Sequence, residues 1–246
     1  MADEFTRKTT FIINSFDRNS KSFKTREYVT EVGNLTTVLD ALIHIKETLD
    51  PAISFRYSCR MGICGSCAMV IDGKPSLACE TNVFKQNKEQ VVVEPIRAQP
   101  LLKSLVTDFD DFFQKHKEVF PWIIRSNNAE RFEDRKEFHQ TEEQRDYFLP
   151  FAECIKCGLC LDACPVVNTN KNFIGPQALG QAYRYIADSK DQGKAKRLDY
   201  LDTLDGAWGC EFSGSCSKVC PKSVDPALAI QLLKSEIAKH KIKKMI

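Results

Sequence analysis

The sequence lacks the features that would mark a nucleotide-dependent enzyme or a membrane-spanning chain. It contains no glycine-rich nucleotide-binding motif, so we expect no site for a flavin or a nicotinamide. It also contains no apolar run of roughly 18 residues, so we expect no transmembrane helix. Residues 1–6 include early acidic residues and no apolar segment, which argues against a secretory signal or a transit peptide. We therefore expect a chain that stays in a reducing compartment.

Histidine is scarce and the net charge is small. The histidines are His44, His116, His139 and His240. They are scattered and form no acid–base constellation, so we expect no catalysis by this chain alone. The net charge of +2 provides no field that would attract nucleic acid, and we expect no nucleic-acid partner.

Cysteine is the residue type that the sequence uses heavily. The 246 residues include eleven cysteines, an odd number that does not suit a disulfide framework in a chain without a secretory signal. Cysteines at tight spacing in a reducing compartment indicate metal sites instead. Residues 80–153 contain no cysteine, and this gap separates two groups. We therefore predict two domains, residues 1–105 and 106–246.

The first half has the pattern of a small sheet with one helix. Apolar alternation and turn residues predict strands at residues 9–16, 26–32, 68–71, 76–79 and 91–93. Thr36 or Thr37 can cap a helix that ends near residue 49, before Asp50-Pro51. Two hairpins and a helix, with a cysteine loop beside the sheet, predict a β-grasp ferredoxin-type domain.

The second half changes to a helical pattern. Apolar residues at helical spacing predict a helix over residues 101–113, and prolines at the first turn predict helices over 176–190 and 226–240. Residues 126–146 carry charges of both signs and are expected to form a solvated surface segment. The whole chain is therefore expected to be α+β, with a mostly α-helical second domain.

The first group of cysteines comprises Cys59, Cys64, Cys67 and Cys79. The first three have the Cys-x4-Cys-x2-Cys spacing of plant-type ferredoxins, which bind a 2Fe–2S cluster, and the fourth follows across the short hairpin. Gly62 and Gly65 suit a loop that wraps a cluster, because glycine permits unusual backbone angles and close approach. A four-cysteine zinc site is the alternative, although such sites usually use two well-separated pairs.

The second group resembles the two runs of a two-cluster bacterial ferredoxin. The runs are Cys154-x2-Cys157-x2-Cys160-x3-Cys164-Pro165 and Cys210-x2-Ser213-x2-Cys216-x3-Cys220-Pro221. In such ferredoxins the fourth cysteine of a run ligates the other cluster. We therefore predict a 4Fe–4S cluster on Cys154, Cys157, Cys160 and Cys220. The other set has only Cys164, Cys210 and Cys216, because Ser213 stands at a cysteine position. Three thiolates predict a 3Fe–4S cluster, with a fourth oxygen ligand from Ser213 or water as the alternative.

These motifs resemble the iron–sulfur subunit of succinate dehydrogenase and fumarate reductase, the complex II family. The resemblance covers nearly the whole chain. It rests on Tyr57-Ser58-Cys59-Arg60-Met61-Gly62-Ile63-Cys64-Gly65-Ser66-Cys67, Cys154-Ile155-Lys156-Cys157-Gly158-Leu159-Cys160, Phe173-Ile174-Gly175-Pro176, and Cys220-Pro221-Lys222 with Asp225-Pro226. It implies an electron-transfer subunit of a succinate:quinone oxidoreductase, with the dicarboxylate chemistry on an FAD-containing flavoprotein partner. It also implies a peripheral position on the cytoplasmic face of a prokaryotic membrane, held by membrane anchor subunits.

The resemblance further implies a quinone beside the three-iron site. Relatives that use ubiquinone carry a tryptophan and a histidine where this sequence has Thr169 and Glu211, so a ubiquinone site of that kind is not expected. Gln231 and Lys234 match positions that approach menaquinone in bacterial fumarate reductases, and Trp208 also fits the family. We predict these three residues in the quinone vicinity, with ordinary surface or core positions as the alternative.

Other interpretations of the chain stay open. From residue 234 onward, five lysines stand against one glutamate, which suits either an anionic membrane surface or a solvated helix end. The iron–sulfur subunit of another flavin-linked dehydrogenase or of a disulfide-reductase complex is an alternative function. Such subunits often lack the 2Fe–2S loop or carry all eight ferredoxin cysteines, so the sequence favours complex II. A zinc-stabilised interaction protein is a third possibility.

Overall fold

The computed structural model describes residues 6–86, 89–125 and 139–245, which form two compact units. The first unit combines Met1–Asp111 with Ile155–Ala163, and the second combines Phe112–Cys154 with Cys164–Ile246. The segment that carries Cys157 and Cys160 thus groups with the first unit, although it follows the gap between the cysteine groups. The predicted boundary between the two domains, after residue 105, stays a prediction.

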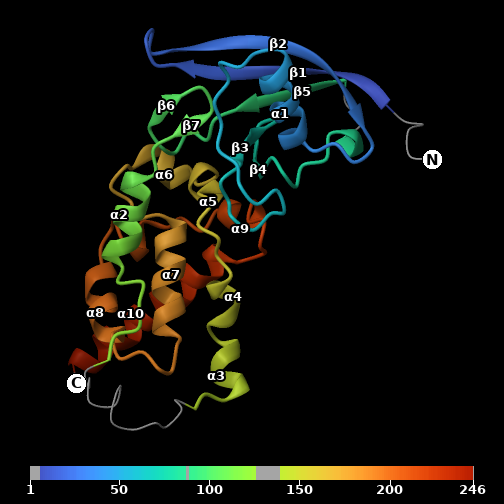
Figure 1. Cartoon of the computed structure of the whole chain (residues 1–246). Helices are drawn as coiled ribbons and strands as arrows, with labels where there is room; N and C mark the ends of the chain where they lie inside the picture. The colour runs from blue at the N-terminus through green and yellow to red at the C-terminus, as the bar shows by residue number, and fades with distance from the viewer. Residues whose placement is uncertain (1–5, 87–88, 126–138, 246) are drawn as a thin grey trace. The chain divides into compact units, whose positions relative to one another are not determined.

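The first unit is built on a five-stranded mixed sheet with strand order β2-β1-β5-β3-β4 (Figure 1). Its strands are β1 (Thr6–Asp17), β2 (Ser22–Gly33), β3 (Ala68–Ile71), β4 (Lys74–Leu77) and β5 (Gln90–Glu94). Neighbouring strands are antiparallel except β1 and β5, which run parallel. The connection between these two passes through helix α1 (Val38–Thr48), as a parallel pair requires a crossover.

The core of this unit follows from the alternation along β1. Phe11 and Ile13 point to the buried face, where they lie opposite Val91 and Val93 of β5, and all four side chains are buried. The predicted helix is confirmed as α1, and Thr37 forms a full capping box with Asp40. Figure 1 shows α1 packed against one face of the sheet, which leaves the cysteine loop between α1 and β3 at its edge.

The helix predicted over residues 101–113 is wrong in its first half. Residues 101–103 form β6 (Leu101–Lys103), which pairs with β7 (Val106–Thr107), and α2 (Asp110–Glu118) begins only after them. β6 and β7 form a separate two-stranded sheet, and the backbone of Ser104 exchanges hydrogen bonds with that of Phe16 at the end of β1, at 2.7 and 3.0 Å, as an isolated bridge. Helical spacing of apolar residues could not reveal this long-range pairing.

The second unit is helical. Its helices are α2 from Phe112 onward, α3 (Glu142–Asp146), α4 (Leu149–Ala152), α6 (Pro165–Thr169), α7 (Pro176–Ile186), α8 (Lys194–Leu201), α9 (Ser215–Lys218) and α10 (Pro226–Met245). The short helix α5 (Leu159–Asp162) belongs to the first unit, and 3₁₀ turns occur at Phe84–Gln86 and Ala207–Gly209. The α+β prediction, with a sheet domain followed by a helical one, is confirmed.

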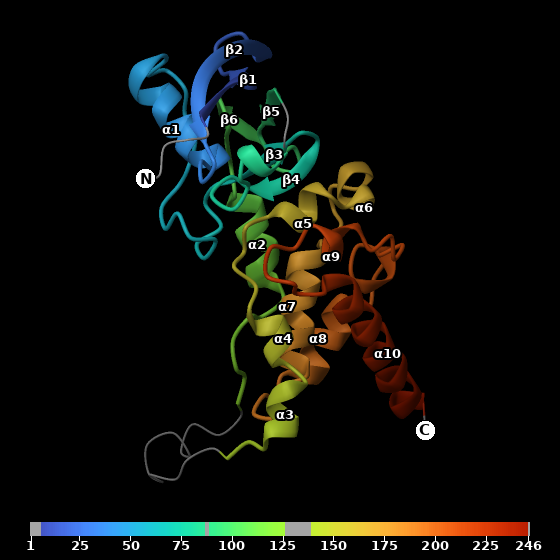
Figure 2. The ribbon, with the colours of Figure 1, turned by 90° about the vertical axis from the view of Figure 1, so that its right-hand side faces the viewer.

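The longest helices of this unit, α7 and α10, pack closely together and carry its core. Both begin with a proline, as predicted, because the first turn does not need that N–H. A Cβ at Gly180 of α7 would lie 3.9 Å from the Cβ of Ala229 on α10, so small residues allow close approach. Figure 2 shows α7 between α4 and the pair α8 and α10.

The polar segment predicted over residues 126–146 falls partly outside the described residues, which leave out 126–138. Its last part, 142–146, forms the exposed helix α3, capped by Thr141. No helix in the described part of the chain is long and apolar enough to cross a membrane.

Candidate metal centres

The first cysteine loop runs from α1 to β3 and closes through the residues after β4. Arg60, Gly62 and Gly65 adopt positive φ angles of 57°, 69° and 74°. These angles fold the loop tightly, and two of the three positions are glycines, which adopt them without a Cβ clash. The loop therefore curls around the thiols instead of extending along the sheet.

Backbone N–H groups of this loop point at two of the cysteine sulfurs. The amides of Met61, Ile63 and Cys64 donate to Sγ of Cys59 at 3.5, 3.4 and 3.3 Å. The amide of Gly62 donates to Sγ of Cys79 at 3.3 Å. Several N–H donors on one sulfur stabilise its thiolate form, which is the form that binds iron. The donor set thus fits a 2Fe–2S cluster.

The other two thiols of this set have pKa values shifted in opposite directions. Hydrogen bonds from the Cys59 backbone and from Ser66 lower the pKa of Cys64 to about 6. Burial, together with the nearby Cys79 thiol, raises the pKa of Cys67 to about 12. Metal coordination deprotonates thiols outright, so iron binding has to remove the proton from Cys67.

The predicted ligands of the four-iron cluster are drawn from both units. Cys157 and Cys160 lie in the first unit, and Cys154 and Cys220 lie in the second. Within the second unit, Nε2 of the buried Gln177 lies 3.9 Å from Sγ of Cys154 and 3.2 Å from Nδ1 of His116. No sequence pattern singles out Gln177, because an amide at a helix start has many ordinary roles. The ligand set stays a prediction.

The three thiols predicted for the three-iron site all lie in the second unit. Burial raises the pKa of Cys216, and the neighbouring charges of Cys164 and Cys210 raise it further. Burial likewise raises the pKa of Cys164, with a smaller contribution from Cys210. These effects agree with the predicted grouping of Cys164, Cys210 and Cys216, which stays a prediction. Ser213, at the position of the absent cysteine, is exposed.

Lys234 and Trp208 lie beside this three-thiol site. Nζ of Lys234 donates to the carbonyl oxygen of Cys210 at 2.8 Å and lies 5.9 Å from the ring centroid of Trp208. The Trp208 indole N–H donates to Asp202 at 2.7 Å, a contact that the sequence did not suggest. Nε2 of Gln231 is buried and has no hydrogen-bond partner among the described residues. A buried amide donor without an acceptor is costly, so Gln231 is suited to a ligand or a water there.

The two positions that depart from the ubiquinone pattern lie on the surface of the same unit. The Thr169 hydroxyl donates to backbone carbonyls of its own helix, Pro165 at 3.3 Å and Val166 at 3.2 Å. Glu211 is exposed. Neither side chain makes the contacts that a tryptophan or a histidine would offer to a quinone.

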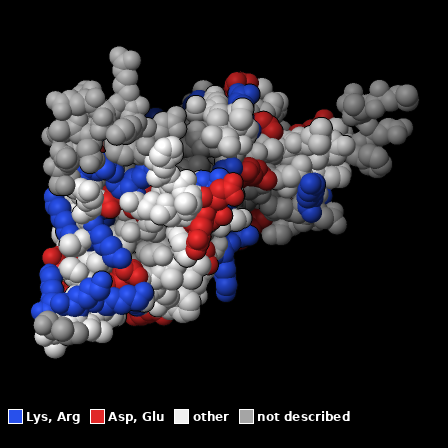
Figure 3. Space-filling model, turned by 90° about the horizontal axis from the view of Figure 1, so that it is seen from below, with Lys and Arg blue, Asp and Glu red and all other residues white. Residues whose placement is uncertain are grey.

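Three lysines of the basic tail form ion pairs with acidic residues of the same unit. The ion pairs are Lys239–Glu236 at 2.9 Å, Lys241–Asp202 at 2.7 Å and Lys244–Asp199 at 2.6 Å. Figure 3 shows blue basic side chains gathered at the lower left, with red acidic ones among them. The surplus of lysines in the sequence therefore overstates the free positive charge that this helix offers to a membrane.

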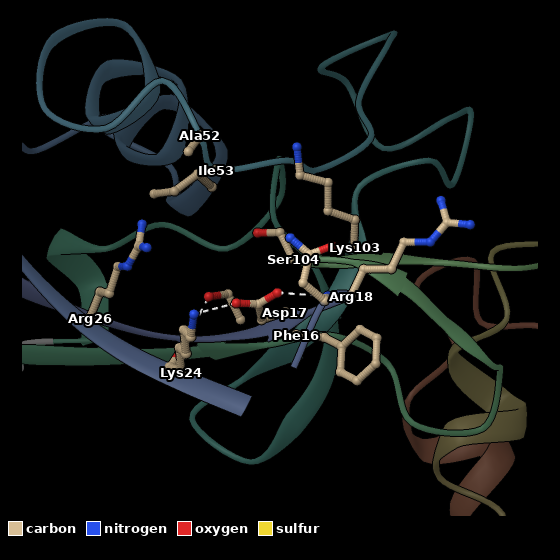
Figure 4. Close-up of a pocket in the computed structure, with 11 residues that line it drawn as sticks. Phe16, Asp17, Arg18, Lys24, Arg26, Ala52, Ile53, Lys103 and Ser104 are labelled. Atoms are coloured by element: carbon tan, nitrogen blue, oxygen red, sulfur yellow. Dashed lines mark hydrogen bonds and ion pairs between the residues drawn. The ribbon is translucent and has the colours of Figure 1, made fainter. Parts of the chain in front are cut away.

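A cavity of about 390 Å³ in the first unit holds no predicted cluster ligand (Figure 4). Its basic lining residues are Arg18, Lys24, Arg26 and Lys103. Lys24 pairs with Asp17, and Arg26 pairs with Asp50 at 2.5 Å, so half of this charge is balanced locally. The Ser104 hydroxyl is buried without a partner among the described residues. The residues that line the cavity therefore include none of the cysteines.

All eleven cysteines are free thiols. Within the described ranges, no three His, Cys, Asp or Glu side chains converge as the ligands of one metal ion do. Thiolates of an iron–sulfur cluster bind different iron atoms and need not converge on one point.

Comparison with known proteins finds two iron–sulfur domain families in the chain. Residues 10–114 match the family of the 2Fe-2S iron-sulfur cluster binding domain, and residues 150–224 match that of the 4Fe-4S dicluster domain. The fumarate reductase iron-sulfur subunit of Mycobacterium tuberculosis is 47% identical over 85% of this chain and 84% of its own length. That of Haemophilus influenzae is 41% identical over 89% of this chain and 88% of its own length.

A solved structure gives the same result for the fold. A chain of the Mycobacterium smegmatis Sdh1 complex in the apo form matches with a TM-score of 0.85 at 25% identity, covering 97% of this chain and 98% of that one. The resemblance drawn from the cysteine motifs is confirmed. The chain therefore belongs to the family of iron–sulfur subunits of fumarate reductase and succinate dehydrogenase.

Proposed function

We propose that the chain is the electron-transfer subunit of a succinate:quinone oxidoreductase and relays electrons between a flavoprotein and a membrane quinone. The observation that carries this proposal is the loop of residues 59–79, whose backbone N–H groups point at the sulfurs of Cys59 and Cys79. Family membership supports it independently. When bound, the clusters supply one-electron carriers, which link the two-electron chemistry of a flavin to a quinone.

We assign the cluster ligands as the sequence predicts them. Cys59, Cys64, Cys67 and Cys79 hold the 2Fe–2S cluster, and Cys154, Cys157, Cys160 and Cys220 hold the 4Fe–4S cluster. Cys164, Cys210 and Cys216 hold a 3Fe–4S cluster. The amides directed at Cys59 and Cys79 support the first set, because N–H donors stabilise thiolates and raise the potential of a cluster. The mutual charge effects within the last set support its grouping.

The quinone, a menaquinone in this proposal, binds near Trp208, Gln231 and Lys234. The unpaired amide N–H of Gln231 supports this, because a quinone carbonyl could accept its hydrogen bond. Lys234 supports it in a second way, since a cation beside the site stabilises negative charge that develops when a quinone is reduced. Exposure of 40% at Trp208 leaves part of its ring accessible.

The partners in this proposal are an FAD-containing flavoprotein and one or more membrane anchor subunits. We assign the interconversion of succinate and fumarate to the flavoprotein, because the scattered histidines of this chain form no acid–base constellation in the sequence. The anchor subunits hold the chain on the cytoplasmic face of a prokaryotic membrane. The names of its relatives as fumarate reductase subunits support this assembly.

Purification of the complex through a tag on this chain tests the proposal. We expect a flavoprotein to co-purify, EPR signals from three distinct clusters, and succinate-dependent reduction of a menaquinone analogue. Cys157→Ser should abolish quinone reduction while dehydrogenation with an artificial acceptor at the flavoprotein continues. A tagged complex without a flavoprotein, or with zinc in place of iron, would contradict the proposal.

A further inference from the structure

Gly65 brings the loop of the first cluster into contact with a predicted ligand of the second. It lies between Cys64 and Cys67 in the sequence, at a φ of 74°. A Cβ on Gly65 would lie 2.9 Å from the Cβ of Cys157 and 3.0 Å from its Cα. Both residues belong to the first compact unit, so this contact lies within one body. The absence of a side chain at residue 65 thus permits the approach of Cys157.

Gly62, in the same loop, is a natural comparison. Its φ of 69° is nearly the same, but a Cβ there would meet only the carboxylate end of the Glu80 side chain. That end can rotate away. The atoms nearest to a Cβ on Gly65 belong to Cys157, a predicted ligand, and to the carbonyl group of Ile155, whose oxygen would lie 3.2 Å away. These atoms cannot move without shifting the loop that carries the ligand. The close approach of the segment that carries Cys157 therefore requires glycine at residue 65 but not at residue 62.

Cys157 is followed by a closely packed segment. Its neighbour Gly158 has a φ of 82°, and a Cβ there would lie 3.1 Å from the ring of Phe109. Two residues after Cys160, Asp162 accepts hydrogen bonds from the amides of Arg97 and Ala98, at 2.5 and 3.0 Å. The segment is thus held on both sides by the first unit. An added methyl group at residue 65 has to displace one ligand loop from the other.

We propose that Gly65 is a positioning residue for electron transfer between the 2Fe–2S and 4Fe–4S clusters. This inference rests on the proposed function, because it assumes that both clusters are carriers in one relay. The step transfers one electron, which oxidises one cluster and reduces the other, and no bond or proton is exchanged. Its rate falls steeply with separation, so the contact between the two ligand loops sets how fast the relay runs.

The test compares Gly65→Ala with Gly73→Ala, in the turn between β3 and β4, in the intact complex. A Cβ on Gly73, at a φ of 77°, has no neighbour within 4 Å, and the residue is outside the cysteine loop. Both substitutions place alanine at a positive φ, so the backbone strain is matched. In fully reduced samples, a nearby reduced 4Fe–4S cluster speeds the spin relaxation of the reduced 2Fe–2S cluster, which raises the microwave power that half-saturates its EPR signal. We expect Gly65→Ala to lower this power several-fold with both clusters present, and Gly73→Ala to leave it unchanged.

Each other outcome has a defined meaning. Unchanged saturation in Gly65→Ala, or equal changes in both variants, overturns the inference, as does loss of the 2Fe–2S cluster alone. Loss of the four-iron cluster with the 2Fe–2S cluster intact supports it, because the methyl group then acts on Cys157. If Gly65→Ala does not accumulate, Phe109→Ala tests the same contact by releasing Gly158, and unchanged saturation overturns the inference. If the wild-type complex lacks either cluster, the proposed function itself fails.

Discussion

Lys234 donates a hydrogen bond from Nζ to the carbonyl oxygen of Cys210 at 2.8 Å. The lysine therefore holds the loop of the three-thiol site as well as supplying a positive charge beside it. Sequence comparison alone suggested a direct contact with a quinone. The structure adds a second role, in which the lysine acts through the backbone of a ligand. The two roles lead to different experimental results.

Replacement of Lys234 by alanine should slow quinone reduction about tenfold or more, because a hydrogen bond to a charged group contributes about 1.5–3 kcal/mol. Electron transfer from succinate to an artificial acceptor at the flavoprotein should stay intact. An unchanged midpoint potential of the three-iron cluster indicates a direct quinone contact, and a shifted one indicates action through Cys210. Lys243→Ala, on the exposed end of α10, is the control and should not alter quinone kinetics.

Replacement of Ser213 by cysteine should convert the three-iron site toward a four-iron one, because it restores the ligand spacing of the first run. The EPR signal of the oxidised three-iron cluster should decline, the iron content should rise, and quinone reduction should slow as the potential falls. Ser213→Ala is the matched control. It should retain the three-iron signal if the serine oxygen is not a ligand, and a large change in this control would show that Ser213 coordinates iron.

The crossover of ligands between the two runs can be tested with two serine variants. Cys220→Ser should damage the 4Fe–4S cluster, although Cys220 lies next to Cys216 in the sequence. Cys164→Ser should damage the three-iron cluster instead, in line with the electrostatic effects that link Cys164 with Cys210 and Cys216. EPR of the oxidised and reduced complex separates the two signals. Loss of the cluster of the neighbouring cysteines in each variant would show that the pairing is wrong.

The ion pair between Arg197 and Asp191 should be a major contributor to the stability of the helical unit. Both side chains are fully buried, the charged atoms are 2.6 Å apart, and Arg197 also donates to the carbonyls of Phe120 and Trp122. Arg197→Ala leaves Asp191 buried without its partner, so we expect a loss of about 3–5 kcal/mol in unfolding free energy.

Chemical denaturation followed by circular dichroism measures this loss. Lys196→Met, on the same helix but exposed, is the control and should cost about 1 kcal/mol or less. Similar losses in the two variants would mean that the buried pair has no special role.

Much of the candidate site could be predicted from the sequence. Ligand spacing, the missing cysteine at Ser213 and the proline at each long helix start are local features, because chain connectivity fixes the distance between residues a few positions apart. The capping box at Thr37 is local in the same sense. These features were sufficient for the family and the α+β fold class.

The tertiary structure alone decided which distant residues meet. The pairing of β6 with β7 and the bridge between Ser104 and Phe16 replaced the first half of a predicted helix, and Asp202 and Asp199 pair with Lys241 and Lys244 of a tail that the sequence presents as basic. The contact of Gly65 with Cys157 likewise joins segments far apart in the chain. Such contacts depend on the packing of whole elements, which no local pattern encodes, and they determine how the cysteine loops are held in place.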